Sequence, residues 1–167
     1  MAYLLLVILL FLLIVLQSAL LPALGMQGVR PDMVLLAVVG WGLAVNPRQA
    51  LLGAILGGLL LDLFSTLPQG TSLLALLPVA VMTELREVDI IGGRLALTPL
   101  LTFLGSLMYY GIALFILYVT GRSLNAVTIL TNIVIPATMM NTLLSLPTLW
   151  LILTLAHWAR RWRSLVL

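Results

Sequence analysis

The sequence has no cysteine, one histidine and few charged residues, with Asp, Glu, Lys and Arg making up 8% of its 167 positions. Without cysteine, the chain forms no disulfide, holds no iron–sulfur cluster through thiolates and uses no thiolate catalysis. Its eight basic residues are all arginines scattered along the chain, so they do not form the patch that nucleic-acid binding requires. We therefore expect no nucleic-acid partner.

The polar residues also do not make a catalytic set. Enzymes within membranes usually combine a nucleophile with a base, a metal cluster or paired carboxylates, and no such combination is evident in the sequence. The single histidine, His157, has no acidic residue near it in sequence and cannot build a zinc site alone. We expect His157 and Trp158 to lie at a membrane interface. The chain is expected to be neither an enzyme nor a metal or cofactor protein.

Apolar residues dominate the chain, at 63% with a mean hydropathy of +1.25. Soluble domains have about 45–50% apolar and about 25% charged residues. Several apolar runs approach the roughly 20 residues that a helix needs to cross a bilayer, and no loop is long enough to bury a soluble core. The composition therefore predicts an all-α membrane protein with a single polytopic domain over residues 1–167.

The apolar runs predict a bundle of six transmembrane helices. The expected spans are residues 3–21, 33–45, 50–67, 73–83, 95–119 and 127–158. The first lacks the basic region and cleavage site of a signal peptide, so we expect it to be retained. The second and fourth, at about 20 and 17 Å, are shorter than the ~30 Å hydrocarbon core. They are expected to borrow flanking residues, to tilt or break, or to lie behind longer neighbours.

The arginines predict the orientation of these spans. With a cytoplasmic N-terminus and six crossings, six arginines lie inside, whereas Arg30 and Arg122 lie outside. This distribution agrees with the positive-inside rule and predicts that both termini are cytoplasmic. The last arginines belong to an expected aromatic and basic anchor at the inner leaflet, made of Arg160, Arg161, Trp162 and Arg163. Two prolines in the sixth span, Pro136 and Pro147, predict a kink or break.

The stretch "LGGLLLDLFSTLPQG" places a carboxylate, Asp62, inside an apolar run. A charge at mid-bilayer costs about 2.5–3.5 kcal/mol and normally has a partner inside the bundle. Arg30, at the outer end of the second span, is the favoured partner of Asp62, with Ser65 among the hydroxyls that complete the hydrogen bonding. Two interpretations stay open: a buried polar group that fixes the fold, which we favour, or an ion or substrate site.

Small residues surround Asp62 on the same expected helix. Four-residue spacing puts Ala54 and Gly58 on the face of Asp62, and Gly53 with Gly57 forms a GxxxG pair about 100° round the helix. This span is therefore expected to be approached closely by neighbouring helices on much of its circumference.

Polar residues at other helix starts also predict local structure. In "GVRPDMVLL", Pro31 suits the first turn of a helix and Asp32 places negative charge near the positive end of its dipole. Asn125 is typical of an N-cap before the sixth span. Asn132 and Asn141, in mid-span, are expected to find hydrogen-bond partners on other helices.

The region from Val29 to Leu76 resembles the signature region of the MreD family, small integral membrane proteins of the bacterial rod-shape system. In that family, a short span begins with arginine or phenylalanine, proline and an acidic or amide residue, and a glycine-rich span ending "GLxxDxxS" follows before a further glycine. The matching positions here are Arg30, Pro31, Asp32, Gly58, Leu59, Asp62, Ser65 and Gly70. The rest of the chain agrees in length, span count and a basic C-terminus.

This resemblance implies a non-enzymatic subunit of the bacterial cytoplasmic membrane. Its direct partner would be MreC, a bitopic protein, and the pair would link the cytoskeletal protein MreB to the polymerase RodA and its penicillin-binding transpeptidase. The small side chains of the third expected span, residues 50–67, would then bind the single transmembrane helix of an MreC-like protein. The resemblance also implies a fold similar to the S-components of energy-coupling-factor importers.

That similarity defines the alternative function, a membrane binding protein for a small vitamin-type ligand. Such a protein needs a pocket lined by convergent polar and aromatic groups. Aromatic residues make up 7% of this sequence, and the expected outer loops are short. The sequence therefore favours the MreD-type function.

Overall fold

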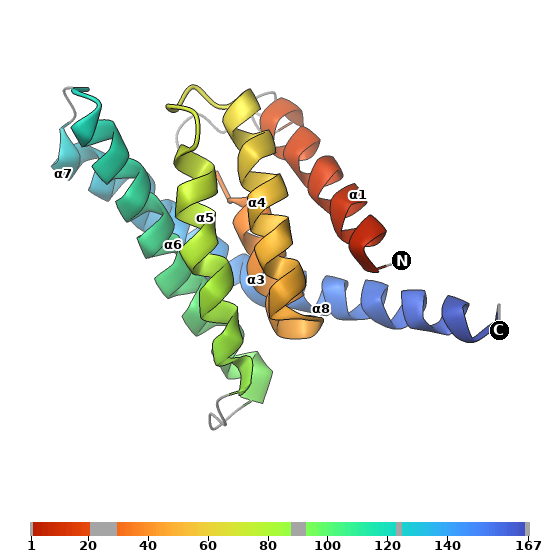
Figure 1. The fold of residues 1–167 in the computed structure, drawn as a ribbon. Coiled ribbons are helices and arrows are strands. Elements are labelled where there is room, and N and C mark those ends of the chain that lie inside the picture. Colours follow the sequence, from red (N-terminus) through yellow and green to blue (C-terminus); the bar gives the residue numbers. More distant parts are fainter. Residues whose placement is uncertain (1, 21–29, 88–92, 123–124, 166–167) are drawn as a thin grey trace.

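A computed structural model describes residues 2–20, 30–87, 93–122 and 125–165 of the chain (Figure 1). Within these ranges the chain is helical apart from short turns and contains no strand. Three of the described helical segments are long and apolar enough to cross a membrane, at Pro47–Phe64, Leu95–Val119 and Val127–Trp158. These segments indicate an all-α membrane protein.

The chain begins with helix α1 (Ala2–Val15), which continues as a π-helical turn, η1 (Leu16–Leu20). Leu6, Leu10 and Ile14 recur every four residues and are fully buried, so they form the face that packs on the bundle. The other described side chains of α1 are apolar and are half-buried or, as at Leu4 and Phe11, exposed. A helix that is apolar all round suits contact with protein on one side and lipid on the other.

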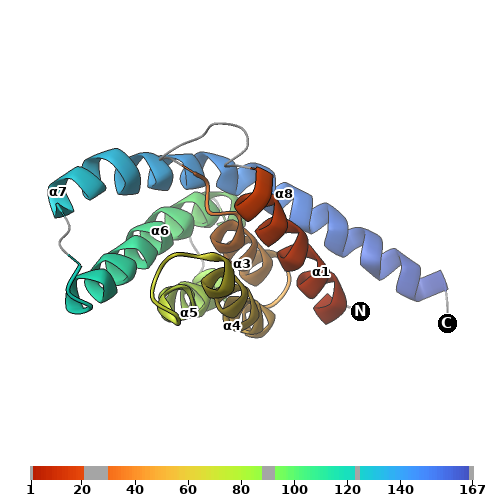
Figure 2. The ribbon, with the colours of Figure 1, turned by 90° about the horizontal axis from the view of Figure 1, so that it is seen from above.

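Helix α3 (Met33–Ala44) is the centre of the bundle, and nearly all of its residues are buried. It contacts α1, α4, α5, α6 and α8, which surround it in the view from above (Figure 2). Trp41 is its largest fully buried side chain, and the Trp41 indole N–H donates to Gln49 Oε1 at 3.0 Å. The expectation that a short second span lies behind longer neighbours is thus met by α3.

Helices α4 (Pro47–Phe64) and α5 (Thr71–Met82) form a tightly packed antiparallel pair. Asn46 begins α4, because its side chain accepts the backbone N–H of Arg48 at 2.9 Å and Pro47 occupies the first helical position. We call the end of the bundle where α4 ends and α5 begins the α4–α5 end. The opposite end, where α3 ends and α4 begins, is the α3–α4 end.

A 3₁₀ turn, η2 (Thr83–Glu87), follows α5, and α6 (Gly93–Val119) returns to the α4–α5 end. The last part of the chain is one long helical path: α7 (Ala126–Ile129), the π-helical turn η3 (Leu130–Val134) and α8 (Ile135–Leu165). This path runs along one side of the bundle and extends beyond it at the C-terminus (Figures 1 and 2).

The six expected spans agree with the observed helices to within a few residues at most boundaries. The break expected at Pro136 is a π-helical turn, η3, which ends two residues before that proline. Because proline has no N–H to offer the preceding turn, wider hydrogen bonding can accommodate it there. Pro147, in contrast, lies inside α8 without interrupting it.

Candidate functional site

The Asp62 carboxylate caps helix α5. Oδ1 accepts the backbone N–H of Ser72 at 2.8 Å, and Oδ2 accepts those of Gly70 at 2.9 Å and Leu73 at 3.3 Å. These N–H groups lie at the start of α5, where a helix has no backbone acceptors of its own. The buried carboxylate, 6% exposed, is therefore compensated by oriented peptide dipoles.

Arg30, the partner expected for Asp62, lies at the same end of the bundle. It is exposed and lines a pocket of about 190 Å³ together with Ser65 and Ser72. Ser65 is the C-cap residue of α4, and its hydroxyl oxygen accepts the backbone N–H of Leu67 at 3.0 Å. The hydrogen bonds described for the carboxylate come from backbone groups, so its pairing with Arg30 stays a prediction.

Asp32 performs the equivalent task for α3. It is the N-cap residue, and its Oδ1 accepts the backbone N–H of Leu35 at 3.2 Å. The backbone N–H of Met33 donates to Gln17 Oε1 at 3.0 Å, which ties η1 to the start of α3. Pro31 precedes Asp32 and lies outside the helix rather than in its first turn.

Asn141 of α8 joins three segments. Its Oδ1 accepts the backbone N–H of Asp32 at 2.8 Å, and its Nδ2 donates to Ser106 Oγ of α6 at 3.1 Å. All three residues are buried. Asn141 thus has the partners on other segments that the sequence predicts for it.

These groups form one interhelical polar cluster. Its members are Gln17, Asp32, Ser106 and Asn141. Tyr109 of α6, 6% exposed, and Ser72 of α5 line the pocket beside Arg30 together with Gln17. Because its polar atoms satisfy one another and the helix ends, the cluster fixes helix positions at low cost.

The small residues of α4 contact this chain's own helices. A Cβ added to Gly53 would touch Leu6, and one added to Gly57 would lie 2.8 Å from Val34. A Cβ on Gly58 would lie 2.5 Å from the Cα of Leu73, so α5 packs directly on its backbone. Ala54 is fully buried between these neighbours.

Helices of this chain pack on these α4 faces, and the binding of another protein's helix to them stays a prediction. Close approach was expected, but the approaching elements are α1, α3 and α5. Gly70, the remaining small residue of the motif, has a different role. Its φ of +89° suits glycine, and its N–H donates to Asp62.

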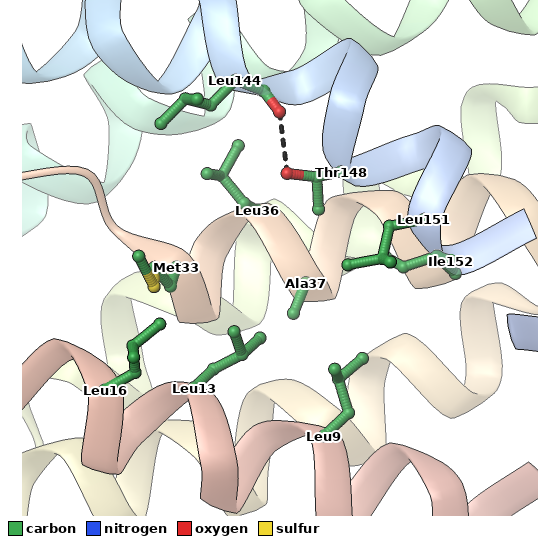
Figure 3. Close-up of a pocket in the computed structure, with 10 residues that line it drawn as sticks. All are labelled: Leu9, Leu13, Leu16, Met33, Leu36, Ala37, Leu144, Thr148, Leu151 and Ile152. Carbon is green, nitrogen blue, oxygen red and sulfur yellow. Dashed lines mark hydrogen bonds between the residues drawn. The ribbon is translucent and has the colours of Figure 1, made fainter. Parts of the chain in front are cut away.

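An apolar groove of about 200 Å³ lies between α1, α3 and α8 (Figure 3). The groove is lined by Leu9, Leu13, Leu16, Met33, Leu36, Ala37, Leu144, Thr148, Leu151 and Ile152. Thr148, its one hydroxyl-bearing residue, donates to the backbone oxygen of Leu144 at 2.7 Å and so offers no free donor. The periodicity of α1 and α8 did not predict this groove, because its lining comes from segments that are far apart in the sequence.

Other expected sites can be placed in part. Asn125 accepts the backbone N–H of Thr128 at 3.3 Å, as an N-cap does. Asn132 is exposed on η3. The backbone of α8 passes through the expected anchor, but the side chains of Arg160, Arg161, Trp162 and Arg163 lie outside the described part of the structure.

In the described ranges, no three His, Cys, Asp or Glu residues come together as metal ligands would. The chain gives no match to protein-family models, to curated proteins or to solved structures. The polar cluster holds helices together, and the apolar groove is open along the side of the bundle.

Proposed function

We propose that the chain is an MreD-type membrane subunit that binds the transmembrane helix of an MreC-like bitopic protein. In this proposal six spans cross the bacterial cytoplasmic membrane, both termini are cytoplasmic, and the fold is similar to that of S-components. The chain has no catalytic role. It couples MreB, through its partner, to RodA and the penicillin-binding transpeptidase.

One observation carries this proposal: residues on which the MreD resemblance rests help to position helices. Asp32 caps α3 and Asp62 caps α5, while Gly58 allows α5 to pack on α4 and Gly70 donates to Asp62. These residues are separated in the sequence, but together they set the positions of α3, α4 and α5. Residues that serve to position helices, rather than to line a reactive site, are expected of a scaffold subunit.

The apolar groove supplies the binding surface in this proposal. Its lining is almost wholly apolar, so it suits the side chains of a single transmembrane helix. Helix association in lipid depends on close packing rather than on the hydrophobic effect, and a concave surface between α1 and α8 gives more packing contact than a convex helix face.

Co-purification of the full chain with a tagged MreC-like protein tests the proposal. Leu151→Trp, in the groove, should weaken the complex about tenfold, since overpacking costs roughly 1–3 kcal/mol. Leu146→Trp is the matched control, because Leu146 has similar exposure on α8 and does not line the groove. Equal complex yields for the two variants would remove the groove from the interface.

The vitamin-binding alternative is favoured by one observation, the pocket beside Arg30. It is lined by Gln17, Ser18, Arg30, Leu61, Phe64, Ser65, Ser72 and Tyr109. Its volume of about 190 Å³ is below the roughly 300–1,000 Å³ of typical small-molecule pockets. Saturable binding of a water-soluble vitamin by the purified chain would favour this alternative over the scaffold.

A further inference from the structure

A second polar pocket lies at the α3–α4 end, far along the bundle from Asp62. It has a volume of about 340 Å³ and is lined by Asn46, Pro47, Arg48, Glu84 and Arg86. Among the side chains that the structure describes, two arginines and one glutamate give the lining a net positive charge. The pocket also contains the first residues of α4, an 18-residue helix whose N-terminal dipole adds positive potential.

Arg86 is held in place by the end of α3. Its Nη1 donates to the backbone oxygen of Val45 at 3.0 Å and to that of Gly42 at 3.5 Å. These carbonyls belong to the last turn of α3 and the residue that follows it, where backbone acceptors lack helical partners. The side chain is half-buried, so its charge has a fixed position at the edge of the pocket.

Arg48 has no comparable structural task. It is exposed, and among the described residues its guanidinium makes no hydrogen bond or ion pair, although its backbone N–H donates to Asn46. A cation in the first turn of a helix is opposed by the helix dipole. Arg48 is therefore unfavourable for α4 itself, which points to a negatively charged ligand that offsets its charge.

The position of the pocket indicates the source of that ligand. Helix α4 is about as long as the hydrocarbon core is thick, so its first turn lies at the level of lipid headgroups. Leu51 and Leu52, one turn further along, are exposed, as side chains that contact acyl chains would be. A lipid whose phosphate enters the pocket would lay its acyl chains along these leucines.

We propose that this pocket binds the phosphate of an anionic phospholipid through Arg48, Arg86 and the N-terminus of α4. The site is independent of the apolar groove and of the proposed partner. Arg86 is the fixed contact, and Arg48 closes over the phosphate from the exposed side. Glu84 opposes binding and limits its strength.

Lipid-dependent thermal stability of the full chain in mild detergent tests this site. Phosphatidylglycerol should raise the melting temperature more than phosphatidylcholine does. Arg48→Gln should weaken the apparent affinity for phosphatidylglycerol about fivefold, the factor that about 1 kcal/mol per basic residue gives, while Arg48→Lys should retain it. Glu84→Gln should strengthen binding.

Two controls make the outcome decisive. Arg122→Gln removes an exposed arginine at the α4–α5 end and should leave the lipid response unchanged, which separates the pocket from general attraction of the surface. Soluble glycerol phosphate should give no response below millimolar concentration. A full response of Arg48→Gln would overturn the proposal, and an equal response to glycerol phosphate would overturn its assignment to lipid.

Discussion

At the scale of single residues, two buried aspartates explain how this bundle tolerates charge. Asp32 begins α3, and Asp62 lies in the last turn of α4 beside the start of α5. Their oxygens accept backbone N–H groups that have no other acceptor in the helix that they cap. Oriented backbone dipoles therefore supply compensating positive charge at both carboxylates. In a chain with so few charged residues, this arrangement stabilises an anion inside the bundle through the backbone itself.

The cap at Asp62 predicts a graded loss of stability. Asp62→Asn keeps one acceptor oxygen and should cost about 1–2 kcal/mol, whereas Asp62→Leu leaves three N–H groups without their acceptor and should cost about 3–5 kcal/mol. Thermal unfolding in detergent measures both. Asn132→Leu, at an exposed position, is the control.

The same substitutions separate the two roles considered for Asp62. A role in fixing the fold requires stability to fall in step with the number of lost acceptors. If Asp62→Leu were no less stable than Asp62→Asn, the cap would not account for the carboxylate. Coupling between Asp62→Leu and Arg30→Leu in a double-mutant cycle would add the arginine to the network.

The need for a partner at Asp62 could be predicted from the sequence, but the kind of partner could not. Composition and burial cost show that a lone carboxylate in an apolar run must be compensated. Candidate side chains such as Arg30 are visible in a sequence, and that pairing stays a prediction. Backbone N–H groups carry no sequence signal, and their approach to Asp62 depends on the turn at Gly70.

At the scale of elements, the close contact between α4 and α5 depends on glycine, which has no side chain, at position 58. A methyl group on Gly58 would meet backbone atoms of Leu73 at 2.5 and 2.8 Å, and backbone cannot move aside as a side chain can. Gly58→Ala should therefore destabilise the protein by about 1–3 kcal/mol through overpacking. Thermal unfolding of the purified variant measures this loss.

Gly53→Ala is the matched control on the same helix. Its added methyl group would lie 3.4 Å from the flexible end of Leu6, which is ordinary contact. Because alanine favours a helix over glycine by about 1 kcal/mol, this variant should be as stable as the parent or more so. Equal destabilisation by the two changes would show that α4 does not pack as described.

Hydrophobic runs and capping residues predicted where the helices begin and end. They did not predict which helices pack against one another. Apolar length, Asp32 and Asn125 identify helix starts because these signals are local. The small faces of α4 predicted close packing correctly but not the identity of the neighbours. Which helix fills a face is decided by the path of the whole chain, and a single sequence contains no direct record of that path.

At the scale of the whole molecule, the alternating directions of the helices and the positions of the arginines together predict the orientation in the membrane. Reporter fusions at residue 70 and at residue 167 should lie in opposite compartments, with residue 167 in the cytoplasm, because arginines concentrate at that side. Paired alkaline phosphatase and fluorescent protein fusions measure this. If both positions reported the periplasm, the arrangement with six crossings would be refuted.

The bond between Asp32 and Asn141 also has a consequence for the timing of synthesis. The two residues are 109 positions apart, and ribosomes add about 5–20 residues each second, so Asn141 is made roughly 5–20 s after Asp32. Until then, the central helix lacks the α8 neighbour that helps to enclose it. The first half of the chain must wait in or beside the insertion machinery, and a product truncated before Asn141 exposes an unfinished core that the cell can recognise and degrade.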